Sequence, residues 1–230
     1  MTSNKNTTKD NTLRKIHLVI DRLVSSGKAV AHADSSIHKI FPAAINAAEG
    51  TALRDWVVKE KASHTVEIGL AYGISVLFIC EGLITNGDKN ARHVALDPYQ
   101  DKSFKNLGLQ SLEEAGVANL VEYHEEESQT ILPRFVKEGR HFDFAFVDGS
   151  HLFDRVFLDL IYLGRLVRPG GIIFVDDYHA QAVAKATSFC LTNLGWKLEE
   201  TSHSDEHHQW AVLRTAPEPI TRSYPHFVDF

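Results

Sequence analysis

The chain has 230 residues, of which 43% are hydrophobic and 23% charged, the composition of a soluble globular domain with a substantial core. A net charge of −6, with no block of basic residues, argues against nucleic acid as a partner. With no signal peptide and no membrane-length apolar run, the sequence predicts a cytoplasmic protein without a membrane partner. Cys80 and Cys190 lie in apolar runs, so we expect buried, reduced thiols.

Hydrophobic periodicity predicts strands that alternate with helices, which is typical of an α/β fold with a parallel sheet. The predicted helices span residues 13–24, 52–59, 72–80, 107–115, 128–136, 156–167 and 180–194. The predicted strands span residues 63–68, 92–97, 120–124, 142–148 and 171–177, followed by a closing hairpin of 196–201 and 209–215. Ser35–Ile37 is expected to cap a further helix, which Pro42 would interrupt or restart.

The run Val-Glu-Ile-Gly-Leu-Ala-Tyr-Gly-Ile-Ser at residues 66–75 predicts a strand, a tight glycine turn and a helix. Gly69 and Gly73 would let a ligand approach closely, and the unpaired N–H groups at the helix start would point into the same crevice. The spacing does not match the G-x-G-x-x-G dinucleotide fingerprint, and no Gly-Lys-Ser/Thr follows as in a P-loop. The run instead resembles motif I of the class I S-adenosylmethionine (SAM) methyltransferases, E-x-G-x-x-x-G-x-S.

This resemblance assigns several residues to the cofactor. Those expected along the methionine side of SAM are Glu67, Gly69, Ala71, Tyr72 and Ser75. Tyr72 is alternatively a packing residue of the helix. Ser128, with Gln129, follows the third strand, where relatives place residues beside the adenine. The alternative is that residues 125–128 are only an acidic helix start.

Each strand expected at the centre of the sheet ends in a carboxylate. The acidic residues at these ends are Glu67, Asp97, Asp148, Asp176 and Asp177. Because ligands bind beyond the carboxyl ends of parallel strands, we expect these side chains at the site. Asp97 is predicted to accept hydrogen bonds from both ribose hydroxyls of SAM. An Asp-Pro turn with Pro98 is the alternative.

Asp148, Asp176 and Asp177 end two strands that are neighbours in this fold, so they are expected to converge. Three uncompensated carboxylates would raise one another's pKa, and a divalent cation resolves this conflict. Oxygen ligands favour Mg²⁺, with Mn²⁺ as a close substitute. Asp148 is also a candidate contact to the cofactor. The alternative is that one Asp caps a helix or binds backbone N–H groups, and that no metal binds.

His151 follows Asp148 by three residues and is the candidate general base, because an imidazole takes a proton from a hydroxyl readily at neutral pH. His179 is a rival base or a further ligand, and a solvated loop residue is the alternative for either His. Three more His lie on the loop of the predicted hairpin. Exposed side chains, or contacts at the substrate rim, are expected for His203, His207 and His208.

Three motifs together resemble the Methyltransf_24-type SAM methyltransferases, which are related to catechol O-methyltransferase and the macrolide-sugar O-methyltransferases. The motifs are Glu-Ile-Gly-Leu-Ala-Tyr-Gly-Ile-Ser (67–75), Val-Asp-Gly-Ser-His (147–151) and Val-Asp-Asp-Tyr-His (175–179). The resemblance covers roughly residues 50–200. It implies a Rossmann-like class I methyltransferase fold, with a seven-stranded, mostly parallel sheet, a terminal antiparallel hairpin and helices on both faces. It also implies SAM, a divalent metal and methyl transfer to a hydroxyl.

Two departures from the catechol-type pattern bear on the substrate. Catechol-type enzymes usually carry Lys where His151 stands and Asn where Asp177 stands, so the sequence looks closer to the sugar O-methyltransferases. Cephalosporin-hydroxylase-like members share this core, so the fold does not fix the reaction. We therefore predict metal-assisted O-methyl transfer to a sugar, a phenol or a natural-product intermediate. The alternatives are a non-catalytic SAM-binding protein and a nicotinamide-dependent oxidoreductase.

The same comparison suggests how the chain is laid out. We expect a disordered tail at residues 1–10 and a helical cover over the substrate side at residues 11–48. The methyltransferase domain is expected at residues 49–215, followed by a C-terminal tail at residues 216–230. Aromatic side chains in the C-terminal tail are candidates for contact with a second subunit of a homo-oligomer. They are Tyr224, Phe227 and Phe230.

Overall fold

The computed structural model describes residues 3–202, 209–218, 223 and 225–230. Its internal contacts group the chain into two units. Unit 1 contains Met1–Ser63 and Leu70–Glu125, and unit 2 contains His64–Gly69 and Glu126–Phe230. The chain passes from unit 2 to unit 1 directly after Gly69, inside the glycine turn that the sequence singled out.

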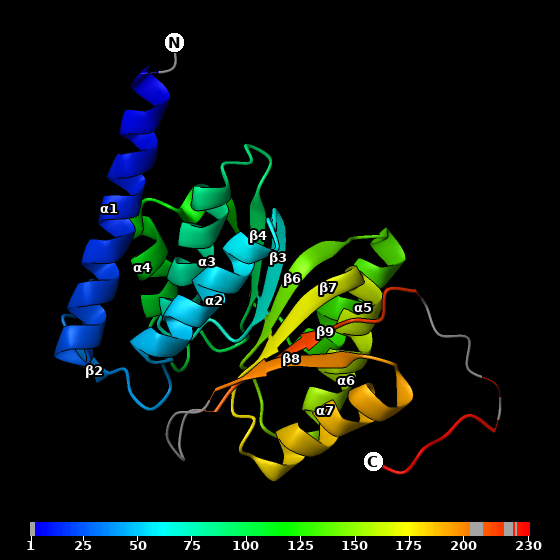
Figure 1. The fold of residues 1–230 in the computed structure, drawn as a ribbon. Helices are drawn as coiled ribbons and strands as arrows, with labels where there is room; N and C mark the ends of the chain where they lie inside the picture. The colour runs from blue at the N-terminus through cyan, green and yellow to red at the C-terminus, as the bar shows by residue number, and fades with distance from the viewer. Residues whose placement is uncertain (1–2, 203–208, 219–222, 224) are drawn as a thin grey trace. The chain divides into compact units, whose positions relative to one another are not determined.

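Unit 1 holds the N-terminal helices and the strands that follow the glycine turn (Figure 1). Its elements are α1 (Ser3–Ser26), β1 (Lys28–Val30), β2 (Ile37–Lys39), α2 (Ala47–Lys59), α3 (Ile74–Asn86), β4 (Arg92–Leu96), α4 (Leu107–Ala115), a short 3₁₀ turn (Ala118–Leu120) and β5 (Val121–His124). Helix α1 packs on α3 and α4, and α2 packs on α3. Helix α3 is buried over most of its length, as its continuous apolar sequence predicts.

Unit 2 contains the strand before the glycine turn and the C-terminal half of the fold (Figure 1). Its elements are β3 (His64–Ile68), α5 (Ser128–Glu138), β6 (Phe142–Val147), α6 (Phe153–Leu166), β7 (Val167–Val175), α7 (Gln181–Asn193), β8 (Lys197–Thr201) and β9 (Ala211–Arg214). Helix α6 packs against both α5, which precedes it in the chain, and α7, which follows it. In β6 the consecutive side chains of Phe144, Ala145 and Phe146 are all fully buried, which is typical of a parallel strand covered on both faces.

The strands form a seven-stranded sheet of order β5-β4-β3-β6-β7-β9-β8. The pairs β4–β5, β3–β6 and β6–β7 are parallel, and β9 is antiparallel to both β7 and β8. The predicted α/β class, with a mostly parallel sheet closed by an antiparallel hairpin, is therefore confirmed. The strand order changes direction between β3 and β6, and such a switch point is where an open α/β sheet binds its ligands.

One element was predicted wrongly. We expected a helix from Ser35–Ile37, but residues 37–39 form β2, which pairs with β1 in a separate antiparallel hairpin. The turn before β2 explains the difference, because the Asp34 carboxylate accepts from the Ser36 N–H at 3.0 Å and Ser35 takes a left-handed φ of +58°. A short Asx turn of this kind competes with helix initiation.

The two ends of the chain bear on the expected layout. Helix α1 begins at Ser3, inside the segment that we expected to be disordered. In the C-terminal tail, the ring of Phe230 lies 5.1 Å from that of Phe189 on α7 of the same chain, edge-on. Phe227 is 61% exposed, and Tyr224 lies outside the described residues. Contact of this tail with a second subunit stays a prediction.

The cysteines behave as the apolar sequence around them predicts. Cys80 and Cys190 are both free and buried, and burial raises the pKa of the Cys190 thiol to about 12. Among the helices in the described part of the chain, none has the length and hydropathy that crossing a bilayer would need. The cytoplasmic location stays a prediction.

Candidate active site

The end of β3 lies against the end of β6 at the switch point of the sheet. The Asp148 N–H donates to the Ile68 carbonyl at 2.9 Å, which brings the chain after β6 close to Gly69. Gly69 has a φ of +98°, and a Cβ built on it would lie 2.1 Å from the Asp148 carbonyl oxygen. Only glycine fits this backbone without moving the loop that carries Asp148.

Gly69→Ala is expected to destabilise the protein by about 2–4 kcal/mol, because it adds a steric clash to an unfavourable φ. Gly87→Ala is the matched control, since Gly87 also has a positive φ of +77° but a Cβ there would meet nothing within 4 Å. Urea unfolding of both variants measures the difference. Equal losses in the two variants would show that the close approach to Asp148 carries no cost.

The carboxylates after β6 and β7 come together because of strand register. Val147 of β6 is level with Val175 of β7, so Asp148 and Asp176, the next residues on each strand, leave the sheet side by side. The pKa of Asp148 is raised well above its ordinary value, first by desolvation and then by the negative charges of Asp176, Asp177 and Glu67. The predicted crowding of acidic groups is thus present within unit 2.

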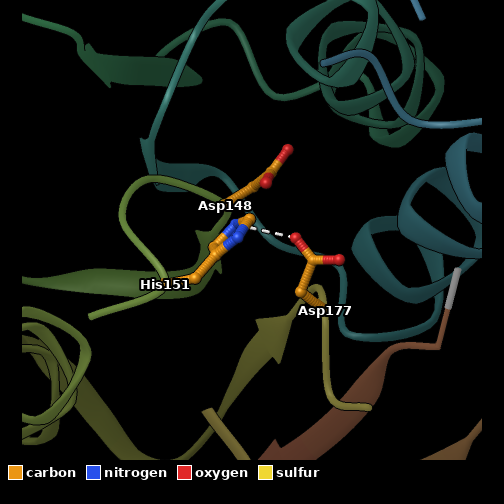
Figure 2. Close-up of side chains that lie close together, drawn as sticks. All are labelled: Asp148, His151 and Asp177. Atoms are coloured by element: carbon orange, nitrogen blue, oxygen red, sulfur yellow. Dashed lines mark ion pairs between the residues drawn. The ribbon is translucent and has the colours of Figure 1, made fainter. Parts of the chain in front are cut away.

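Figure 2 shows the three side chains whose ligand atoms gather at this point, Asp148, His151 and Asp177. One ligand atom from each lies within 4.8 Å of the other two. His151 Nε2 lies 2.7 Å from Asp177 Oδ2, and this hydrogen bond is the main cause that raises the pKa of His151. His179 Nδ1 lies 3.7 Å from the other Asp177 oxygen, so Asp177 faces both histidines.

Asp177 has a φ of +53°, a left-handed conformation that is uncommon for a non-glycine residue. Asp176 fixes this turn, because its Oδ1 accepts from the Asp177 N–H at 2.6 Å. Asp176 itself is 7% exposed. It was predicted as a metal ligand, but the three side chains whose ligand atoms lie within 4.8 Å of one another include His151 and not Asp176. Backbone strain of this kind concentrates at functional sites, where the surrounding structure holds it in place.

The donor set at this point fits a divalent cation. Two carboxylates and an imidazole are a mixed oxygen and nitrogen donor set. Carboxylates suit Mg²⁺ and Mn²⁺ alike, so these two ions are the candidates. The crowded negative charge around Asp148 supports the same conclusion, because a bound cation would offset it.

Asp97 lies in unit 1 at the end of β4 and is 3% exposed. Its Oδ2 accepts from the N–H groups of Leu70 and Ala71, at 3.2 and 2.9 Å, and from Gln100 Nε2 at 2.8 Å. Its Oδ1 accepts from the Tyr99 N–H at 2.8 Å. Asp97 therefore braces the glycine turn, in which Ala71 has a φ of +43°, and the sequence alone did not suggest this role.

The remaining cofactor candidates are buried. Glu67 in β3 is 0% exposed, Ser75 in the first turn of α3 is 6% exposed and Tyr72 is 8% exposed. The Tyr72 ring packs edge-on against Phe104 at 5.3 Å, and its carbonyl accepts from the Ser111 hydroxyl at 3.0 Å. Tyr72 thus makes the packing contacts that were its alternative role, and its contact with the cofactor stays a prediction.

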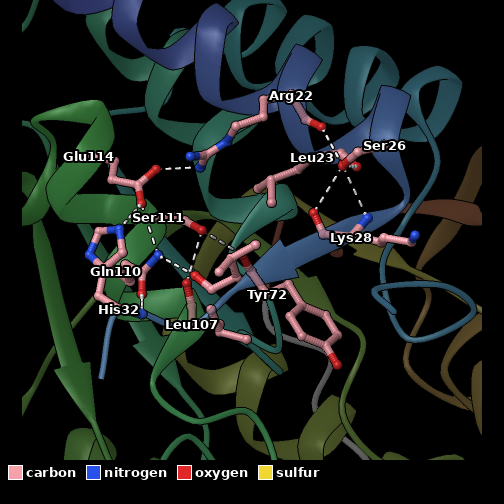
Figure 3. Close-up of polar contacts among 11 residues, drawn as sticks. Arg22, Leu23, Ser26, Lys28, His32, Tyr72, Leu107, Gln110, Ser111 and Glu114 are labelled. Atoms are coloured by element: carbon pink, nitrogen blue, oxygen red, sulfur yellow. Dashed lines mark hydrogen bonds and ion pairs between the residues drawn. The ribbon is translucent and has the colours of Figure 1, made fainter. Parts of the chain in front are cut away.

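A polar network joins the N-terminal segment to α4 within unit 1 (Figure 3). Glu114 pairs with Arg22 of α1 and, at 3.2 Å, with His32. Gln110 donates to the Val30 carbonyl at 3.0 Å and accepts from the His32 N–H at 2.9 Å. The segment that we expected to cover the substrate is therefore attached to α4 by both backbone and side chains.

Ser128 is the first residue of α5 and is 6% exposed. Gln129 Nε2 donates to Ser128 Oγ at 2.8 Å and to Asp159 Oδ1 of α6 at 3.4 Å. Asp159, which is 1% exposed, was not among the residues predicted from the sequence. An available signal was its position on the otherwise apolar face of the predicted helix 156–167. The other candidates, His203, His207 and His208, lie outside the described residues.

Comparison with known proteins places this geometry in a family. A family model described as a methyltransferase domain matches residues 66–178. Caffeoyl-CoA O-methyltransferase 1 from Eucalyptus globulus is 31% identical over 134 residues, which are 57% of this chain and 51% of the relative. Caffeoyl-CoA O-methyltransferase 3 from Nicotiana tabacum is 30% identical over 135 residues, 57% of this chain and 52% of the relative. The chain thus spans about half the length of these curated relatives.

Solved structures share the fold at low sequence identity. The O-methyltransferase TomG from Streptomyces achromogenes, solved with SAM, has a TM-score of 0.68 at 21% identity and covers 86% of this chain and 89% of its own. An O-methyltransferase from Bacillus cereus, solved with SAH, has a TM-score of 0.68 at 16% identity and covers 88% and 90%. Residues 66–178, which carry the glycine turn and the Asp148, His151 and Asp177 cluster, thus match the model of this methyltransferase family.

Proposed function

We propose that the protein is a SAM-dependent O-methyltransferase that acts, with a divalent cation, on a hydroxyl of a small molecule. The observation that carries the proposal is the gathering of Asp148, His151 and Asp177 within 4.8 Å, in the segment matched by the family model. The names of its relatives and structural neighbours, O-methyltransferases that include complexes with SAM and SAH, support the same reaction. The acceptor belongs to the class of sugars, phenols and natural-product intermediates.

The residues around the glycine turn support SAM as the cofactor. Gly69 lets the end of β3 pack directly against the Asp148 backbone, where a Cβ would clash, and this contact holds the start of the turn in place. Asp97 Oδ1 accepts one hydrogen bond from described residues, and a carboxylate oxygen has room for a second. We therefore assign Asp97 to one ribose hydroxyl of SAM, while its Oδ2 holds the glycine turn. SAM supplies the electrophilic methyl group.

The roles of the clustered side chains follow from their contacts. A divalent cation held by Asp148 and Asp177 would supply positive charge that favours the ionised form of the acceptor hydroxyl. Asp177 orients His151 through the 2.7 Å contact to Nε2, which leaves Nδ1 to remove the proton from that hydroxyl. Most of the rate would come from holding the acceptor oxygen in line with the methyl group.

The test combines binding and turnover on full-length protein purified without chelator. Calorimetry with SAH and with NAD separates a methyltransferase from a nicotinamide-dependent oxidoreductase. Formation of SAH from SAM with catechol-type and sugar-type acceptors then separates an enzyme from a SAM-binding protein. Binding of SAH with no turnover on any acceptor would favour the binding protein, and binding of NAD alone would overturn the proposal.

Removal of the metal is expected to lower turnover by about 100-fold or more, because the carboxylates lose the charge that offsets them. Addition of Mn²⁺ or Mg²⁺ after EDTA treatment and desalting is expected to restore the activity, because the two carboxylate ligands suit both ions. Metal analysis of the treated protein confirms that it is empty. Full turnover by that protein would contradict the role of a cation.

A further inference from the structure

Unit 1 contains a cavity that the proposed reaction does not use. Helices α1 and α2 both pack on α3, and a cavity of about 450 Å³ is lined by residues of these three helices. Small-molecule sites in proteins have volumes of roughly 300–1,000 Å³, so this cavity is large enough for one. None of the described residues that line it belongs to the glycine turn or to the cluster of Asp148, His151 and Asp177.

The cavity exists because α2 carries small residues where it borders this space. These residues are Ala47, Gly50 and Thr51. A Cβ on Gly50 would lie 2.1 Å from the ring of Phe78, so Phe78 of α3 takes the place of a side chain there and forms an apolar wall. Ile20 and Val24 lie one turn apart on α1 and add apolar surface on the other side. A ligand would therefore meet apolar walls.

Glu81 is the only charged residue of the buried helix α3, and it lines the cavity. It is 7% exposed. Its Oε1 lies 3.0 Å from His17 Nε2 and 3.4 Å from Arg54 Nη1, whereas its Oε2 has no hydrogen-bond partner in the described part of the chain. A buried carboxylate is costly unless its oxygens are hydrogen-bonded, so Glu81 has capacity for a further donor. The His17 side chain is half exposed, so it can turn away and give a ligand in the cavity access to this carboxylate.

The charges on the wall of the cavity leave an excess of negative charge. Asp21 lies one turn after His17 on α1, lines the cavity and forms no ion pair with another described residue. Among the described lining residues, Arg54 alone carries a permanent positive charge, and its Nε and Nη2 donate to Asp55 at 2.9 and 2.7 Å. Asp55 offsets the charge of Arg54, so the carboxylates of Asp21 and Glu81 favour a cationic ligand.

We propose that this cavity is a second ligand site, which takes an organic cation with an apolar body. The cationic group is a primary ammonium that donates to Glu81, with the charge of Asp21 beside it, because hydrogen bonds between ionised groups are the strong ones. The apolar body lies against Ile20, Val24 and Phe78, which removes its surface from water. The ligand is distinct from SAM, since the residues assigned to SAM do not line the cavity.

The experiment measures the binding of three probes of similar size to the full-length protein by calorimetry at neutral pH. The probes are 2-phenylethylamine, which is a cation, 2-phenylethanol, which is neutral, and 3-phenylpropionate, which is an anion. The wild-type protein is expected to bind the amine with a Kd below about 1 mM, and the other two at least about tenfold more weakly. Failure to bind the amine, or equal affinity for the amine and the alcohol, overturns the inference.

Two variants each remove one negative charge from the cavity with little change of shape. Asp21→Asn and Glu81→Gln are each expected to weaken binding of the amine by about fivefold or more. Asp10→Asn is the matched control, because Asp10 is an exposed carboxylate of the same helix that is not among the lining residues. It is expected to leave the affinity for the amine unchanged.

Thr51→Phe tests the cavity itself, because a large ring at this position would fill the space between α1 and α2. Binding of the amine is expected to disappear in this variant. Should Glu81→Gln not fold, Asp21→Asn and Thr51→Phe decide the question. Affinity for the amine that is unchanged in both of them would place its binding elsewhere on the protein and overturn the inference.

Discussion

Asp148→Asn is expected to abolish methyl transfer while making the metal-free protein more stable at neutral pH. The Asp148 carboxylate is desolvated and faces the charges of Asp176, Asp177 and Glu67, which together raise its pKa. A carboxyl group with a raised pKa in the folded state costs stability as pH rises from its unfolded value, near ~4, through its folded value. Asn removes that cost, so the gain is present at neutral pH and disappears in acid.

The expected gain is on the order of 1 kcal/mol, or about 2–4 °C in Tm. Turnover is expected to fall by about 100-fold or more, because a ligand to the cation is lost. Thermal unfolding with and without Mn²⁺ checks both parts, since the ion should raise the Tm of the wild-type protein and not that of the variant. A lower Tm for the metal-free variant at neutral pH would contradict the argument.

Asp143→Asn provides the opposite control on the same strand. Asp143 accepts from the His64 N–H at 2.9 Å and pairs with Arg168 at 3.2 Å, so its negative charge is compensated in the folded state. Its replacement is expected to lower the Tm slightly at neutral pH. If the Tm falls in Asp143→Asn and rises in Asp148→Asn, the gain in Asp148→Asn comes from relief of crowded negative charge and not from the loss of a carboxylate in general.

The position of the site could be predicted because strand ends are visible in the sequence. An apolar run such as residues 142–147, followed by Asp148, predicts both a buried strand and a carboxylate beyond its carboxyl end. Helix α4, predicted at 107–115, has these bounds in the structure, because Gly116 takes the left-handed conformation that ends it. Local signals of this kind do not depend on the rest of the fold.

What could not be predicted depends on contacts between distant residues. The alignment of His151 with Asp177 follows from the left-handed turn at Asp177, which the Asp176 carboxylate holds. Asp97 was assigned to the ribose, yet two of the four hydrogen bonds that its carboxylate accepts come from Leu70 and Ala71, a role set by how β4 meets the glycine turn. The hairpin of β1 and β2 was missed because a few polar residues at 34–36 favour a turn over a helix.

His151→Gln is expected to lower turnover by about 10²–10⁴-fold with SAH affinity unchanged, because it removes the general base and leaves the cofactor residues intact. Calorimetric titration with Mn²⁺ then defines the role of the imidazole. Unchanged metal affinity identifies His151 as the base, whereas a large loss identifies it as a ligand. If His179→Gln loses turnover and His151→Gln does not, the base is His179 instead.

The pH dependence gives the sharpest form of this prediction. Hydrogen bonding to Asp177 raises the pKa of His151, and only the neutral imidazole can accept a proton, so turnover should fall as pH drops through that pKa. Asp177→Asn removes the main cause of the shift, so the acid limb of its pH–rate profile should move to lower pH, with reduced turnover throughout. The profiles are measured in the same Mn²⁺ concentration. An acid limb at the same pH in both proteins would show that His151 is not the group that titrates.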